Sequence, residues 1–131
     1  MVVFVDTSAI YALANAADPN HGRSVEALRS ALEAGEELLT HNYVVVESAA
    51  LLHRRLGWIA VSRFVREASA FRIRWVDDIL HRAAAERFSK RRGQVSLVDE
   101  VSFLVMREAG IQRALAFDQD FLAQGFHPYP G

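Results

Sequence analysis

The chain has 131 residues, of which 51% are hydrophobic and 24% charged, and its formal net charge is −1. This length suits one globular domain that buries about two-thirds of the surface of its unfolded chain. No apolar run approaches ~18 residues and no basic leader precedes the first apolar stretch, so we expect neither a membrane span nor a secretory signal. Cysteine is absent, which excludes disulfides and thiolate metal sites. We therefore expect a single domain over residues 1–131, located in the cytoplasm.

The basic residues are, except for Lys90, all arginines. Arginine binds phosphate through two N–H groups, which suits an RNA-handling surface. A GC-rich genome produces the same bias, and a net charge near zero counts modestly against a nucleic-acid binder. Composition alone leaves both explanations open.

The first half of the chain alternates short apolar runs with longer helical stretches. Residues 2–5 predict a buried strand, and Asp6-Thr7-Ser8 predicts the start of a helix over residues 8–16. Asp18-Pro19 predicts the start of the next helix, which ends near residue 34. The later predictions are a strand at 37–40, a helix at 43–56 ended by Gly57, and a helix from Trp58 to about residue 68.

The second half continues this alternation. The predictions are a strand at 71–76, a helix from Asp77 or Asp78 to about Arg92, a helix from Ser96 to Gly110, a strand at 113–117 and a short final strand at 126–129. Strands that alternate with helices predict an α/β three-layer sandwich, with a parallel sheet flanked by helices. We expect the strands at 2–5 and 113–117 to lie side by side at its centre.

Two aspartates follow predicted strands directly. Asp6 comes after the run at 2–5, and Asp118 comes after the run at 113–117. The carboxyl ends of parallel strands share one edge of the sheet, where ligands bind in open α/β folds. Each aspartate also suits a purely structural role, Asp6 as a helix cap and Asp118 in a turn. Thr7 and Ser8 can supply the capping oxygen themselves, which leaves Asp6 free for a site.

Two further acids lie in apolar helical stretches. Glu47 has apolar or aromatic neighbours one turn away on both sides, and Asp99 lies in the first turn of the helix that begins at Ser96. A capping box or the helix dipole also accounts for Asp99, and an edge position of an amphipathic helix accounts for Glu47. Glu100 is rotated by ~100° from Asp99 and is the poorer candidate. Asp120 is a possible helper of Asp118.

Together these acids predict a metal site. Carboxylates in apolar settings need a partner, and an oxygen-only pocket suits Mg²⁺ or Mn²⁺. The predicted activity is metal-dependent hydrolysis, with phosphodiester cleavage as the best candidate chemistry. The expected catalytic and metal-binding residues are Asp6, Glu47, Asp99 and Asp118.

The chain resembles the PIN-domain ribonucleases, and in particular the VapC-like toxins of prokaryotic toxin–antitoxin pairs. The motifs that carry this resemblance are Val-Asp-Thr-Ser-Ala at 5–9, Asn-Tyr-Val-Val-Val-Glu at 42–47, Ser-Leu-Val-Asp at 96–99 with Ser102-Phe103, and Phe-Asp-Gln-Asp-Phe at 117–121 with Gly125-Phe126. They span essentially the full length. The resemblance implies a five-stranded parallel sheet and an endoribonuclease whose four acids surround the metal. Glu100 departs from the pattern, because many relatives carry a neutral residue there.

The resemblance also implies partners. These are an RNA substrate, a cognate antitoxin that commonly covers the site with an arginine reaching the acids, and a second copy of the chain in a homodimer. A helical stretch contains Trp58, Ile59, Val61, Phe64 and Val65, most of which we expect in the core and the surplus at a dimer face. Basic candidates for the rim of the site are Arg54, Arg55, Lys90, Arg91 and Arg92. The histidines show no metal-ligand spacing, and His41 and His53 are expected in packing or at the surface.

Other functions remain as alternatives. An aspartyl phosphatase needs a second aspartate two residues after Asp6, and Ser8 stands at that position. A phospho-accepting receiver domain needs a lysine after a late strand, whereas Lys90 falls in a predicted helix. A PIN nuclease in RNA processing, or a PIN-like module that only binds RNA or protein, would keep the same fold. The presence of all four acids argues against the second of these.

Overall fold

A computed structural model describes residues 1–130. The first elements in chain order are β1 (Val2–Val5), α1 (Thr7–Ala14), α2 (His21–Glu33), β2 (Glu37–His41), α3 (Asn42–Leu56), α4 (Trp58–Glu67) and the 3₁₀ turn η1 (Ala68–Ala70). They are followed by β3 (Arg72–Arg74), α5 (Asp78–Lys90), α6 (Leu97–Ala109), β4 (Arg113–Leu115), α7 (Gln119–Ala123) and β5 (His127–Pro128). No helix in this range is long and apolar enough to cross a membrane.

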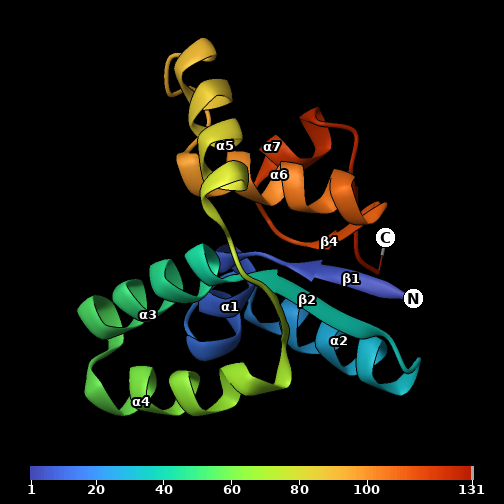
Figure 1. The fold of residues 1–131 in the computed structure, drawn as a ribbon. Coiled ribbons are helices and arrows are strands. Elements are labelled where there is room, and N and C mark those ends of the chain that lie inside the picture. The colour runs from blue at the N-terminus through green and yellow to red at the C-terminus, as the bar shows by residue number, and fades with distance from the viewer. Residues whose placement is uncertain (131) are drawn as a thin grey trace.

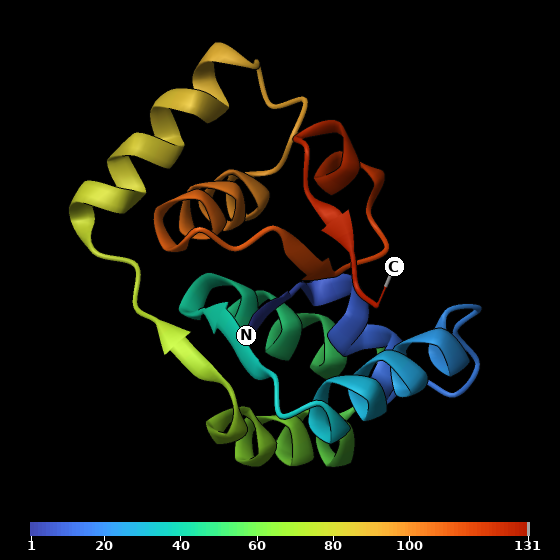
Figure 2. The same ribbon diagram turned by 90° about the vertical axis from the view of Figure 1, so that its right-hand side faces the viewer.

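The strands form one parallel sheet in the order β3-β2-β1-β4-β5. Phe4 of β1 pairs with Leu39 of β2 on one side and with Ala114 of β4 on the other. Helices α1–α4 lie on one face of the sheet, and α5–α7 lie on the other (Figures 1 and 2). The predicted three-layer α/β sandwich is confirmed, as is the contact between the strands near residues 2–5 and 113–117.

The boundaries of several elements differ from the predictions. Helix α2 begins at His21, because the side chain of Asp18 accepts the backbone N–H of Asn20 at 2.8 Å and forms a turn ahead of the helix. Strands β3 and β4 are shorter than predicted. The sequence patterns also missed α7, a helix of one to two turns that Asp118 caps by accepting the backbone N–H of Asp120 at 2.9 Å.

The core centres on β1, whose Val3, Phe4 and Val5 are almost completely buried. The expectation that most apolar residues of α4 fill the core is wrong. Val61 and Phe64 are buried, whereas Trp58, Ile59 and Val65 are 71%, 77% and 58% exposed. The reason is helical periodicity, because Val61, Phe64 and Ala68, spaced by three and four residues, share the inward face of this outer helix, and Ile59 lies on nearly the opposite side. Trp58 and Val65 lie beside that inward face and remain exposed.

His41 joins three elements behind the functional edge of the sheet. It ends β2 and is fully buried, and its Nδ1 accepts the backbone N–H of Val44 at 3.3 Å, which caps α3. Its Nε2 lies 2.9 Å from Ser102 Oγ on α6, and this hydroxyl donates to the carbonyl of Val98 at 3.0 Å. Burial lowers the pKa of His41 to about 3, so the ring is neutral at ordinary pH. As expected, His41 is a packing residue, and His53 lies at the surface.

A buried ion pair holds α5 and α7 against α6. Glu100 is completely buried, and the Nε of Arg91 lies 3.1 Å from its carboxylate, although the N–H is not aligned for a hydrogen bond. Arg91 also donates through Nη2 to the side-chain oxygen of Gln124 at 3.2 Å. The additional negative charge at residue 100 is therefore compensated from α5.

We predict that Arg91→Ala destabilises the protein by about 3 kcal/mol, because it leaves the Glu100 carboxylate buried without a partner. The matched control is Lys90→Ala, which removes only the exposed pair with Glu86 and should cost less than ~1 kcal/mol. Urea unfolding of both variants provides the measurement. Equal losses in the two variants would contradict this role of the buried pair.

Candidate metal centre

Asp6 lies where β1 passes into α1, at the carboxyl edge of the sheet. It is only 4% exposed, and its Oδ2 accepts the backbone N–H of Ser8 at 3.1 Å and the Ser8 hydroxyl at 2.7 Å. The expectation that Thr7 or Ser8 caps α1 in its place is wrong, since Asp6 itself is the cap. Both hydrogen bonds from Ser8 go to Oδ2 and not to the other oxygen, Oδ1. Asp6 can therefore cap the helix with one oxygen and bind a ligand with the other.

Glu47 reaches the same edge from α3. The hydroxyl of Thr7 donates to its Oε1 at 2.6 Å, and the hydroxyl of Ser48 lies 3.3 Å from Thr7 Oγ1. Thr7 follows Asp6 directly, so this bond ties Glu47 to the start of α1. The two acids are close enough that the Glu47 charge contributes to the raised pKa of Asp6.

Asp99, Asp118 and Asp120 form the tightest group of acids. One carboxylate oxygen from each lies within 4.8 Å of the others. Asp99 lies in the first turn of α6, and its backbone N–H donates to the hydroxyl of Ser96 at 3.0 Å, which confirms the predicted cap. Asp120, proposed from sequence only as a helper, is brought to the site by α7.

The acids act on one another electrostatically. Burial raises the pKa of Asp99 to about 8, with further contributions from the negative charges of Asp6, Asp118 and Glu47. Burial also raises the pKa of Asp6, although hydrogen bonds from Ser8 oppose that shift. For Asp120, burial and then the Asp118 carboxylate raise the pKa. The four acids selected from the sequence are thus close enough to interact electrostatically, because the charges of the other three act on Asp99.

The residues fit a divalent metal ion. The ligands on offer are all carboxylate oxygens, which hard cations such as Mg²⁺ and Mn²⁺ prefer. Within residues 1–130, none of the four acids forms an ion pair with a basic side chain. The concentration of uncompensated negative charge is therefore a feature that a bound cation would neutralise.

The basic residues expected at the rim of the site have other contacts. Arg91 pairs with Glu100, Lys90 pairs with Glu86, and the guanidinium of Arg55 stacks 5.5 Å from the ring centre of Tyr11. Arg54 and Arg92 are exposed and have no ion pair within the described chain. None of these contacts ties a rim candidate to the acids.

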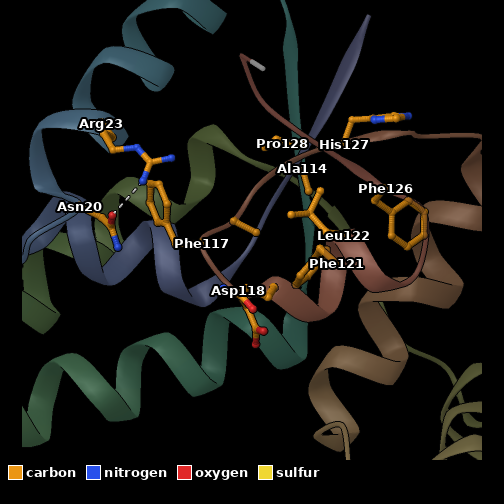
Figure 3. A pocket seen from close by; sticks show the side chains of 12 residues that line it. Asn20, Arg23, Ala114, Phe117, Asp118, Phe121, Leu122, Phe126, His127 and Pro128 are labelled. Atoms are coloured by element: carbon orange, nitrogen blue, oxygen red, sulfur yellow. Dashed lines mark hydrogen bonds between the residues drawn. The ribbon is translucent and has the colours of Figure 1, made fainter.

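A cavity that sequence patterns did not indicate adjoins the acids. Its volume is about 190 Å³, and Asp118 lies in its wall together with residues from α2, β4, α7 and β5 (Figure 3). The guanidinium of Arg23, on α2, lies 5.2 Å from the ring centre of Phe117 in this wall. Neither residue stands out in the sequence, because only the fold brings α2 beside the segment that follows β4.

Known proteins resemble this chain in sequence and in fold. The family model described as the PIN domain matches residues 3–126. The 23S rRNA-specific endonuclease VapC20 of Mycobacterium tuberculosis is 40% identical over 130 residues, which cover 95% of each chain. The crystal structure of that protein, described as a sarcin-ricin loop cleaving toxin, matches with a TM-score of 0.82 and 37% identity over 96% of each chain. PAE2754 from Pyrobaculum aerophilum shares the fold, with a TM-score of 0.64 and 22% identity over 99% of this chain and 90% of its own. The chain belongs to the PIN-domain family of metal-dependent nucleases and, within it, to the VapC-like endoribonuclease toxins.

Proposed function

We propose that a single PIN domain spanning residues 1–131 cleaves RNA at the acidic centre with Mg²⁺ or Mn²⁺ as its cofactor. The observation that carries this proposal is the cluster of acids without basic partners at the carboxyl edge of the sheet, where burial and then the neighbouring negative charges raise the pKa of Asp99 to about 8. Asp6, Glu47, Asp99 and Asp118 are the proposed catalytic residues. The divalent ion supplies a bound water of lowered pKa and offsets negative charge on the phosphate.

We assign different tasks to these side chains. Asp6 and Asp99 are the proposed direct ligands, because the helix-capping bonds of Asp6 use only its Oδ2, and Asp99 lies near the negative charges of Asp6, Asp118 and Glu47. Thr7 orients Glu47 through its hydroxyl. Glu47 and Asp118 would contact the metal ion through water or accept the proton of the attacking water. No side chain forms a covalent bond to the substrate in this scheme.

Ribosomal RNA is the proposed substrate. The support is the 40% identity, over nearly the full length of both chains, to an endonuclease named for its action on 23S rRNA. This choice is preferred to a role in general RNA processing, which the fold alone leaves open. Such an activity takes place in the cytoplasm.

The proposed protein partners are a cognate antitoxin and a second copy of the chain. The antitoxin follows from the likeness to VapC-like toxins, and a positively charged segment would complement the acidic centre. The homodimer is supported by Trp58, Ile59 and Val65, which leave an apolar patch on the outer face of α4. An adjacent short reading frame whose product fails to inhibit cleavage would contradict the antitoxin proposal.

Replacement of a ligand should remove both metal binding and cleavage. We predict that Asp6→Asn and Asp99→Asn each weaken Mn²⁺ binding about tenfold or more, because asparagine keeps the size of the side chain and a capping oxygen but loses the charge. Calorimetric Mn²⁺ titration and cleavage of an RNA pool with and without EDTA provide the measurements. Asp78→Asn, an exposed change on α5, is the matched control. Unaltered Mn²⁺ binding in both site variants, or cleavage that survives EDTA, would refute the metal-dependent mechanism.

The acids should also make the metal-free protein sensitive to pH. Folded Asp99 keeps its proton up to a pKa of about 8, whereas an unfolded aspartate releases it near 3.8. The folded state therefore binds more protons between these values, so this group lowers the free energy of unfolding as the pH rises through that window. In EDTA we predict that wild type and Asp99→Asn are similarly stable near pH 5. Near pH 8 the variant should be more stable by on the order of 1 kcal/mol.

Urea unfolding in EDTA at several pH values measures this difference, and taking the difference between the two proteins cancels the other titrating groups. Saturating Mn²⁺ should reverse the order at pH 8, because only wild type gains the full binding energy of the ion. A stability difference that does not change with pH would contradict the raised pKa of Asp99.

The dimer should depend on the apolar face of α4. We predict that wild type sediments as a dimer and that Ile59→Asp sediments as a monomer, because a carboxylate buried in an apolar interface has no partner. The control is Leu32→Asp, another exposed apolar position on a different helix. A monomeric wild type, or a dimer in both variants, would contradict this assignment of the interface.

A further inference from the structure

The cavity beside Asp118 combines apolar walls with one cationic edge. Phe117, Leu122 and Pro128 contribute apolar surface, and Asn20 and Arg23 contribute polar groups from the start of α2. In Figure 3 the ring of Phe117 lies between the Arg23–Asn20 pair and the apolar side chains of α7. Leu122 is 58% exposed, so the apolar wall is open to an incoming ligand.

Arg23 has no negative partner within residues 1–130. Its contacts are the face of the Phe117 ring and a long hydrogen bond of 3.4 Å from Nη1 to Asn20 Oδ1. Seven other basic side chains of this chain are paired with carboxylates. Among the arginine and lysine side chains of the described residues, only Arg23 is both unpaired and in the wall shared with Asp118. Arg23 can therefore donate N–H groups to an anion such as a phosphate, beside an acidic centre that would otherwise repel that anion.

The position of Phe117 is linked to the acids by a short chain of hydrogen bonds. Its backbone N–H donates to the hydroxyl of Ser8 at 3.0 Å, and that hydroxyl donates to Asp6 Oδ2 at 2.7 Å. Asp118 is the next residue. The aromatic wall of the cavity is thus held in register with two of the acids, so a group bound there has a defined position relative to them.

We propose that this cavity is a nucleotide subsite of the RNA-cleaving centre. An unpaired base next to the scissile phosphate packs against Phe117 and Leu122, and Arg23 binds a phosphate oxygen of the same nucleotide. This inference rests on the proposed ribonuclease function and adds the part of the substrate that the cavity holds.

The size and chemistry of the cavity favour a single nucleotide over a larger ligand. Its volume of about 190 Å³ is below the ~300–1,000 Å³ of pockets that enclose drug-sized molecules. Proteins that read single-stranded RNA stack unpaired bases on aromatic rings and bind the backbone with arginine. Arg23 and Phe117 supply one group of each kind.

The test uses substrates that lack one base. Wild type is first used to map a cleavage site, and short single-stranded RNAs are then made with an abasic nucleotide on either side of that site. One abasic RNA should be cleaved with kcat/KM reduced by about fivefold to a hundredfold. In Phe117→Ala that penalty should disappear, because the base has lost its aromatic contact. Phe117→Leu keeps an apolar side chain in the wall and should reduce the penalty. It serves as the control for a folding defect in Phe117→Ala.

Arg23→Ala should raise KM about tenfold on intact and abasic RNA alike, with kcat nearly unchanged. Arg29→Ala is the matched control, because Arg29 lies on the same helix, pairs with Glu26 and does not line the cavity. The subsite proposal would be overturned if Arg23→Ala and Arg29→Ala had equal KM values, or if the abasic penalty persisted in both Phe117 variants. In either case, cleavage of RNA by wild type would still support the proposed ribonuclease function. A wild type that cleaves no RNA would overturn both.

Discussion

Electrostatic repulsion between carboxylates is the constraint on which this site depends. Asp6, Glu47, Asp99 and Asp118 come from four separate elements, and the fold brings their charges together without a basic counter-charge. Burial increases the cost, because charges interact more strongly away from water. Burial is the largest cause of the raised pKa of Asp99, and the charges of Asp6, Asp118 and Glu47 raise it further. A divalent cation is the simplest partner that turns the repulsion into attraction.

Local backbone geometry allows the fold to hold these acids in place. Asp6 caps α1 and Asp118 caps α7, so each aspartate uses one oxygen to begin a helix. Asp99 is held differently, since Ser96 caps α6 and the cap uses the backbone N–H of Asp99 and not its side chain. Helix capping and metal binding are therefore compatible functions of one carboxylate, because the two oxygens can serve different partners.

Outside the centre, the buried side chains of Glu100 and His41 have partners within the described residues. Glu100 follows Asp99 directly and is equally enclosed, yet Arg91 compensates it from α5. His41 is neutral and bonded on both ring nitrogens. Asp99 is left without an opposite charge, whereas the adjacent Glu100 is paired with Arg91. This contrast distinguishes the proposed metal ligand from a structural charge. The same criterion distinguishes Arg23 from the paired arginines.

The amino-acid sequence by itself determined the order of the strands and of every α-helix except the short α7, because hydrophobic periodicity and capping residues act locally. It also indicated the four acids, because carboxylates at strand ends and in apolar helices are unusual. Tertiary structure decided what depends on contacts between distant segments. It placed Asp120 in the acid cluster, paired Arg91 with Glu100, exposed Trp58, Ile59 and Val65, and brought Arg23 beside Phe117. These outcomes follow from which helix faces meet across the sheet, and no local pattern of residues encodes that choice.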